Sequence, residues 1–360
     1  MGAAVDSHGW SVGVILLTLR DLVYRKTRFV VVSVLGAVVF ALLFVMTGLV
    51  EQFNLEPVDT VTTIGADAWV VPEGVSGPFN ATSVVPADTI DAVEADTKAA
   101  VVTSRSSLLA DGEPQEVILV GHEPGGLGSP VPSAGRAARV SGELVADQTT
   151  GVEVGDNVTV AGRSFEVVGT TRNTTLLAGI PVVFITLPDA QELAFRTNQV
   201  VSAILVEGKV SAIPSGAKVM TSAEVVEDLL HPLDGAIASI DLVRGLLWIV
   251  AAIIIGAVVF LSALERQRDF AVLKAVGAPN SALLGSLALQ AVLVALAAVA
   301  LAAVIQIFLA PQFPLHVRVP ARAFWQLPLL AVVMALCAGA VGMRKVLRSD
   351  PSQAFSGAGG

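Results

Sequence analysis

Four long stretches without a charged residue constrain the fold of this chain more than any other feature. They are Phe29–Val50, Leu246–Leu264, Ser281–Ala310 and Phe324–Met343. A helix rises about 1.5 Å per residue, so each stretch can cross a hydrocarbon core of about 30 Å. Composition agrees, because 54% of the residues are hydrophobic and only 15% are charged, with a mean hydropathy of +0.74. The sequence therefore predicts an α-helical membrane protein with four transmembrane helices.

Two of these stretches have an alternative interpretation. Phe29–Val50 could be a secretory signal peptide, but it is longer than a signal-peptide core and no small-x-small cleavage site follows it. Phe324–Met343 could be a buried core helix, although its length and the basic residues after it favour a membrane span. Ahead of the first stretch, Trp10–Arg28 mixes apolar and charged residues periodically, which predicts an N-terminal amphipathic helix on the membrane surface.

Basic residues near the helix ends predict the orientation, because loops rich in Lys and Arg stay in the cytoplasm. They cluster before the first helix, between the second and third, and after the fourth, so both termini are predicted to be cytoplasmic. Arg318 and Arg322, in the short loop between the third and fourth helices, run against this trend. The basic residues that agree with the predicted cytoplasmic side are Arg20, Arg25, Lys26, Arg28, Arg266, Arg268, Lys274, Arg344, Lys345 and Arg348.

These assignments predict a domain inserted between the first and second helices and facing away from the cytoplasm. It holds 26 acidic and 9 basic residues, a net charge of −17, which argues against nucleic acid or anionic lipid as its partner. The predicted division is a cytoplasmic amphipathic helix (1–28), transmembrane helix 1 (29–50), an extracytoplasmic domain (51–241), transmembrane helix 2 (242–264), a cytoplasmic coupling segment (265–280), transmembrane helix 3 (281–310), an outer loop (311–323), transmembrane helix 4 (324–343) and a cytoplasmic tail (344–360).

The inserted domain is predicted to be mixed α/β. Residues 157–168 are expected to form a hairpin that turns at Gly162, and Thr221–Glu224 is a capping-box pattern that begins a helix. Helices are also expected at Pro86–Asp96 and Pro188–Arg196. Because Cys337 is the only cysteine, no disulfide can form within the chain. Strands are expected at Asp67–Val71, Ala100–Ser104, Gln115–Val120, Phe165–Thr170, Pro181–Ile185 and Val201–Val206.

Motifs for nucleotide, metal and nucleophile chemistry are missing from the sequence. It has no G-x-x-x-x-G-K-[ST] phosphate loop, no H-E-x-x-H or C-x-x-C metal spacing, and no G-x-S-x-G nucleophile turn. The chain is therefore not expected to be an enzyme by itself, nor to hold a cofactor or a metal of its own.

The segment between the second and third helices carries the most specific signal. It is ERQRDFAVLKAVGA at residues 265–278, a charged amphipathic stretch that offers a partner both apolar anchors and directional ion pairs. An ordinary charged cytoplasmic loop is the alternative. The stretch resembles the signature of the FtsX/MacB-type (type VII) ABC transporter permeases. The residues expected to couple to an ATPase are Glu265, Arg266, Arg268, Asp269, Phe270 and Lys274.

Two further segments are similar to the same family. RSDPSQAF at residues 348–355 resembles its terminal motif, and residues 142–145 leading to 155–160 resemble the core of its outer domain. The resemblance implies a homodimer that rests on two copies of a separate cytoplasmic ABC ATPase, which would bind the ATP and Mg. It also implies a bacterial cell membrane as the location.

Residues 67–79 resemble most the branch of this family that contains the HrtB haem exporters and the DevC permeases. This finer resemblance implies that haem is taken from the outer leaflet at the dimer interface, with Met46, Glu51 and Phe53 as candidate contacts. Met46 and Glu51 would lie about 140° apart around a helix, so one iron ligand from each protomer is easier than both from one. Each also has an ordinary role: packing for Met46, a boundary charge for Glu51 and core for Phe53.

Two other functions stay open from the sequence. The chain could export a glycolipid, a lipoprotein or a drug, or it could be a mechanotransmitter that moves an envelope partner without transporting anything. An exporter predicts ATP hydrolysis that its ligand stimulates, whereas a mechanotransmitter predicts a bound outer partner.

Overall fold

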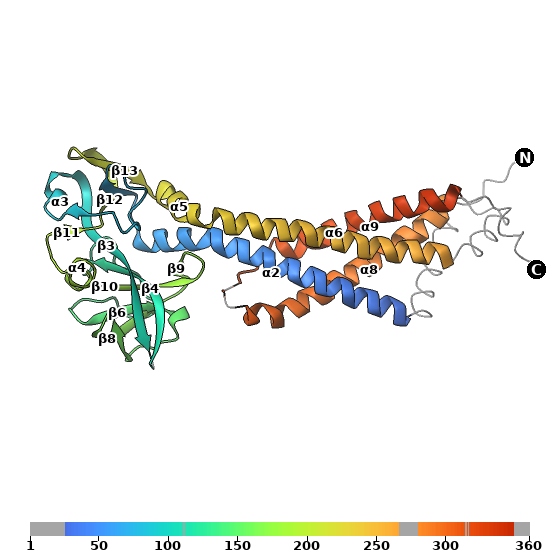
Figure 1. Cartoon of the computed structure of the whole chain (residues 1–360), viewed down its shortest axis with the longest axis horizontal. Helices are drawn as coiled ribbons and strands as arrows, with labels where there is room; N and C mark the ends of the chain where they lie inside the picture. The colour runs from blue at the N-terminus through green and yellow to red at the C-terminus, as the bar shows by residue number, and fades with distance from the viewer. Residues whose placement is uncertain (1–25, 111, 266–279, 314, 316, 349–360) are drawn as a thin grey trace, which may run out of the picture. The chain divides into compact units, whose positions relative to one another are not determined.

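The computed structural model describes residues 26–110, 112–265, 280–313, 315 and 317–348. It divides into two compact units (Figure 1). The α/β unit is Gln52–Ala238, and the helical unit consists of the described residues that precede and follow it. The predicted N-terminal amphipathic helix lies outside the described residues, apart from the three residues 26–28 that begin the first long helix.

Small residues allow the long helices of the helical unit to pack closely. One face of α8 is lined by alanines that are almost fully buried, and a Cβ placed on Gly36 of α2 would lie 3.1 Å from Ala298 Cβ. Helices in a membrane associate by such close packing, because lipid provides no hydrophobic drive between them. The four helices that share this core are α2 (Lys26–Ile64), α6 (Asp234–Glu265), α8 (Asn280–Leu309) and α9 (Ala323–Arg348).

Three helical stretches among the described residues are long and apolar enough to cross a membrane: Phe29–Ile64, Ser222–Glu265 and Gly285–Gln312. The apolar part of α9 covers only Ala323–Cys337 in that description. Three of the expected spans are thus supported, and the fourth stays a prediction.

Helix α2 does not end where its apolar run ends. It continues from Val50 to Ile64, through Glu51, Glu56 and Pro57, and therefore contributes residues to both units. Its end is marked by Gly65, which has φ +75° and donates its N–H to Val61 O. Hydropathy located the apolar part of this helix, but the stop signal is local and lies at the glycine.

The strands of the α/β unit form a closed circuit, β3–β4–β10–β6–β8–β7–β3, with two parallel pairings, β4 with β10 and β6 with β8. From β3 the sheet continues outward through β12 and β1 to β13 (Figure 1). The strands are β1 (Ala68–Pro72), β2 (Val85–Pro86), β3 (Glu94–Ala110), β4 (Glu113–His122), β5 (Ala134–Gly135), β6 (Glu143–Asp147), β7 (Asn157–Val160), β8 (Arg163–Thr171), β9 (Thr175–Leu176), β10 (Ile180–Thr186), β11 (Val200–Val201), β12 (Ala203–Ala212) and β13 (Ala217–Thr221).

Both faces of this sheet are buried. Along β4, Val117 and Leu119 belong to one apolar cluster, whereas Ile118 and Val120 belong to the other. Side chains alternate between the two faces of a strand, so burial on both sides requires a continuous apolar run rather than an alternating one. This explains why the strands appear in the sequence as short blocks of Val, Ile and Leu.

Most local predictions for the α/β unit are confirmed, including its mixed α/β character. Each predicted strand overlaps an observed one, and the hairpin turns at Ala161 and Gly162, both with positive φ. The helix predicted at 188–196 is α4 (Leu187–Phe195). The capping box of Thr221 and Glu224 begins α5 (Ser222–Leu230).

The helix predicted over Pro86–Asp96 is wrong. Only α3 (Thr89–Ala92) is helical there, and β3 begins at Glu94. The ammonium group of Lys98 donates to the carbonyl oxygens of Ile90 and Val93, at 2.6 and 2.8 Å. These bonds satisfy acceptors at the end of α3 while the following residues pair with β12. Tertiary pairing therefore overrides the local helical pattern.

Close backbone packing at Gly169 gives a test of this fold. A Cβ on Gly169 of β8 would lie 2.4 Å from Arg136 O and 3.1 Å from Ala134 O, and backbone cannot move aside cheaply. We expect Gly169→Ala to destabilise the protein by about 2–4 kcal/mol. Gly126→Ala is the control, because its nearest contact is at 3.4 Å. Equal thermal unfolding midpoints for the two purified variants would contradict this account of β8.

Candidate functional site

At one end of the helical unit, the connection between α8 and α9 lies directly against α2. A Cβ on Gly48 would be 2.7 Å from Val317 Cγ1 and 3.1 Å from the backbone nitrogen of Val319. Only glycine therefore allows this approach. One turn before Gly48 on α2, the ring of Phe44 packs on the ring of Phe324 in α9, with centroids 5.2 Å apart.

An ion pair joins the same elements. Arg322, immediately before α9, contacts the carboxylate of Glu51 on α2 through its Nη2. The Glu51 side chain is 18% exposed and that of Arg322 is 59% exposed. The carboxylate of Glu51, a candidate iron ligand from the sequence, thus forms an ion pair with the guanidinium of Arg322. Each residue was noticeable in the sequence, but nothing there connected them across 271 positions.

The three predicted substrate contacts do not form one cluster in either unit. Met46 is half-buried on α2 in the helical unit, together with Glu51. Phe53 is 3% exposed and belongs to the α/β unit. Both interpretations of Phe53, as a core residue and as a haem contact, stay predictions, and so does a haem role for Met46 and Glu51.

A second polar contact lies inside the helix bundle. Gln290 on α8 donates from Nε2 to Ser262 Oγ on α6, at 3.4 Å, and both side chains are buried. Among the described residues, no donor reaches Gln290 Oε1. Polar groups buried inside membrane helices are costly, so they usually serve a purpose. These two helices flank the predicted coupling segment.

The coupling residues themselves are mostly outside the described part of the chain. Glu265 is the exposed last residue of α6. The other predicted coupling residues are Arg266, Arg268, Asp269, Phe270 and Lys274, all within the undescribed stretch 266–279.

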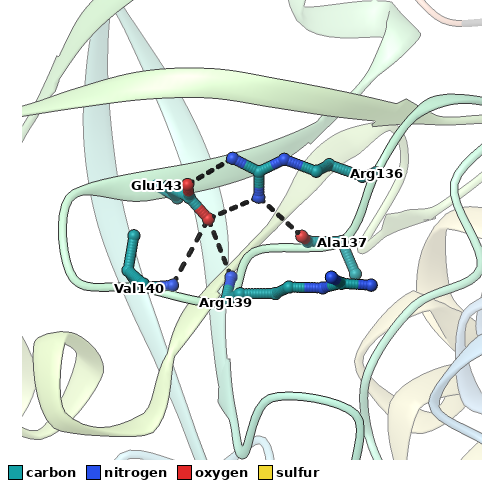
Figure 2. A network of polar contacts seen from close by, with 5 residues as sticks. All are labelled: Arg136, Ala137, Arg139, Val140 and Glu143. Atoms are coloured by element: carbon teal, nitrogen blue, oxygen red, sulfur yellow. Dashed lines mark hydrogen bonds and ion pairs between the residues drawn. The ribbon is translucent and has the colours of Figure 1, made fainter.

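In the α/β unit, a buried carboxylate closes the loop before β6 (Figure 2). Glu143 accepts hydrogen bonds from Arg136 Nη1 at 2.7 Å and from the backbone nitrogens of Arg139 and Val140 at 2.8 and 3.3 Å; Arg136 Nη2 also contacts it. Hydrogen bonding from Arg136, assisted by these N–H groups, lowers the pKa of Glu143 to about 2. The carboxylate is therefore charged at physiological pH and acts as a structural clasp.

Other buried carboxylates are satisfied in the same manner. Glu56 accepts from Gln52 Nε2 at 3.0 Å and from the backbone nitrogens of Ala178 and Gly179 at 3.1 Å each. Asp189 accepts from Gly142 N at 2.9 Å and forms an ion pair with Arg163 at 2.8 Å. Such partners fix loops in place, although burial raises the pKa of Glu56 above its ordinary value.

His122, at the end of β4, is fully buried. Its Nδ1 lies 2.9 Å from Glu123 O, and among the described residues Nε2 has no partner. Burial lowers the pKa of His122, so the ring is neutral at physiological pH. Among the described residues, no group of three or more His, Cys, Asp and Glu side chains could hold a metal ion.

Apolar helices long enough to span a membrane and an inserted α/β unit are typical of membrane proteins that carry a separate domain. The segment that matches the family model described as FtsX-like permease C-terminal is residues 242–351. An uncharacterised ABC transporter permease of Mycobacterium bovis is 40% identical over 343 residues, which cover 94% of this chain and 98% of that protein. A second such permease, from Mycobacterium tuberculosis, is 39% identical over 343 residues with the same coverage. The chain therefore belongs to the FtsX-like ABC transporter permeases, as its signature predicted.

Among solved structures, the extracellular domain of the ABC-type transporter YknZ from Gram-positive bacteria matches with a TM-score of 0.31 and 14% identity. The match covers 43% of this chain and 99% of that domain.

The Glu143 clasp gives a testable prediction. Glu143→Gln removes the charge that Arg136 and the loop N–H groups bind, and we expect it to destabilise the protein by about 2 kcal/mol at pH 7. Glu116→Gln is the matched control, because Glu116 pairs with Arg105 between β3 and β4 with both side chains more than half exposed. If thermal unfolding of the two variants gave equal losses, the clasp would not hold the loop.

The same variant tests the pH dependence. The pKa of Glu143 lies at about 2 in the folded chain, below the ordinary value of 4.5, so the clasp contributes fully only above about pH 4.5. We expect the difference between wild type and Glu143→Gln to shrink as pH falls from 4.5 toward 2. A constant difference over this range would contradict the lowered pKa.

Proposed function

We propose that this chain is the permease subunit of an ABC exporter, a homodimer driven by two copies of a separate cytoplasmic ATPase. The observation that carries the proposal is family membership together with a charged segment between α6 and α8. Because the chain has no phosphate-binding loop, a partner must bind and hydrolyse the ATP. The proposed location is a bacterial cell membrane, with a multi-pass topology and both termini in the cytoplasm.

Haem is the ligand that we propose for this exporter. The likeness of residues 67–79 to the HrtB and DevC branch supports this assignment. On α2, Met46 supplies a thioether and Glu51 a carboxylate, and one ligand from each protomer would complete the iron coordination. Since Glu51 contacts Arg322, iron coordination by Glu51 requires that this ion pair open, whereas Met46 needs no such change.

Two alternative functions predict different results in the same experiments. Export of a glycolipid, a lipoprotein or a drug predicts stimulation of ATP hydrolysis by those ligands instead of haem. A mechanotransmitter predicts no stimulation by any ligand and a stable complex with an envelope protein.

A haem titration tests the ligand. We expect the purified, detergent-solubilised chain to give a saturable shift of the haem absorption band, and Met46→Ala combined with Glu51→Ala to lose it. Met334→Ala is the control, because it removes a half-buried thioether from α9 instead of α2. A shift retained in the double variant would place haem elsewhere, and no shift in the wild type would remove haem as the ligand.

Charge reversal at Arg268 tests the coupling segment. Arg268→Glu would repel an acidic partner surface on the ATPase, so we expect ligand-stimulated ATP hydrolysis by the copurified complex to fall at least about tenfold. Arg105→Glu, at an exposed position on β3 of the α/β unit, should leave stimulated ATP hydrolysis unchanged. Normal stimulated turnover in Arg268→Glu would show that coupling does not use this charge.

A further inference from the structure

Arg322 has a position that the charge pattern of the chain does not explain. On the proposed topology it lies on the outer side of the membrane, where basic residues are disfavoured. The ion pair with Glu51 uses only part of the hydrogen-bonding capacity of Arg322. A guanidinium carries five N–H donors in a planar fork, and among the described contacts Glu51 is reached through Nη2. The difference in exposure, 59% for Arg322 against 18% for Glu51, means that the carboxylate is covered while much of the guanidinium stays accessible.

An exposed aromatic side chain follows Arg322 on the same helical face. The backbone nitrogens of Trp325 and Gln326 both donate to Arg322 O, at 3.3 and 3.0 Å, so residues 322 to 326 already form a helical turn. Residues three positions apart on a helix are neighbours, which places Trp325 beside Arg322. The Trp325 side chain is 60% exposed, although the ring of the adjacent Phe324 packs on Phe44.

We propose that Arg322 and Trp325 bind the anionic headgroup of an amphiphile in the outer leaflet, with Glu51 positioning the guanidinium. Arg recognises planar carboxylate and tetrahedral phosphate through paired hydrogen bonds, and Trp provides a flat apolar surface at the depth of the headgroups. The inference rests on the proposed topology and on export of a membrane ligand. The shared chemistry is a carboxylate or phosphate on an apolar body, supplied either by the transported ligand or by a phospholipid.

The ligand arm uses haem and its dimethyl ester, which share ring and iron but differ in the two carboxylates. In absorption titrations of the full-length chain in detergent, we expect Arg322→Gln to weaken haem binding about tenfold and to leave ester binding unchanged. Arg244→Gln is the matched control, since Arg244 forms an ion pair with Asp241 on α6 of the same unit. Glu51→Gln should reduce the preference for haem over its ester less than Arg322→Gln does, because Arg322 keeps its charge but loses the carboxylate that positions it.

The lipid arm uses the chain in nanodiscs of phosphatidylcholine, with and without phosphatidylglycerol. If a lipid is the source of the anion, phosphatidylglycerol raises the thermal unfolding midpoint of the wild type, and Arg322→Gln loses this increase. The lipid experiment tests the inference even if neither haem nor its ester binds. Failure of both to bind would remove haem as the ligand in the proposed function, but it would leave the inference about Arg322 and Trp325 to the lipid experiment.

Trp325→Ala provides a second variant, because it leaves the ion pair with Glu51 intact. We expect it to weaken haem and the ester alike by removing the apolar contact, or to reduce the gain from phosphatidylglycerol. The inference is overturned if Arg322→Gln and Trp325→Ala both match the wild type in the two arms. That result would leave these residues as anchors at the membrane surface.

Discussion

The lack of any possible disulfide is the constraint on which the α/β unit depends. With Cys337 as the only cysteine, its loops must be held by packing and polar contacts alone. Buried carboxylates meet this need: Glu56 binds the N–H groups of the loop before β10, and Glu143 binds those of the loop before β6. Each brings a charge out of water, which is tolerable because several donors surround it.

The Glu56 contact shows why such an anchor is required. Leu177, Ala178 and Gly179 all have positive φ, a run of left-handed backbone that is unfavourable for the two residues with side chains. Successive N–H groups in this conformation point toward one side and form a concave anion site. A carboxylate on α2 therefore stabilises a loop that local preferences alone would not select.

Features that depend on a few neighbouring residues could be predicted from the sequence. The hairpin at Gly162 and the capping box of Thr221 need no distant partner, and both are observed. The helical spans are also local, since hydropathy averages over a single stretch. The short α3 could not be predicted in this manner, because a contact with another element decides it: Lys98 of β3 binds the end of α3. The end of α2 was missed for another reason, since its stop signal, Gly65, is local but lies beyond the apolar run.

In the candidate sites, too, single residues could be recognised in the sequence, whereas their pairing could not. Glu51 was visible as a carboxylate at the end of an apolar run, and Arg322 as a charge on the unexpected side. Their pairing depends on how α2 and α9 pack, which Gly48 allows by leaving room for the chain that leads into α9. The Gln290–Ser262 contact was likewise hidden, because a single amide or hydroxyl in an apolar run carries no signal of its partner.

On the proposed function, a separate ATPase binds the ATP, and the permease responds because the states of that ATPase bind it differently. In that proposal, the difference enters through groups that face the ATPase and biases the arrangement of the helices that flank the charged segment. The contact between Gln290 and Ser262 joins the helices on either side of the charged segment. It is long, and no donor in the described part of the chain reaches Gln290 Oε1. A joint that is incompletely satisfied in one arrangement costs less to break than a fully bonded one. On the proposed coupling role of residues 265–278, this property suits a contact between the two helices that flank that segment.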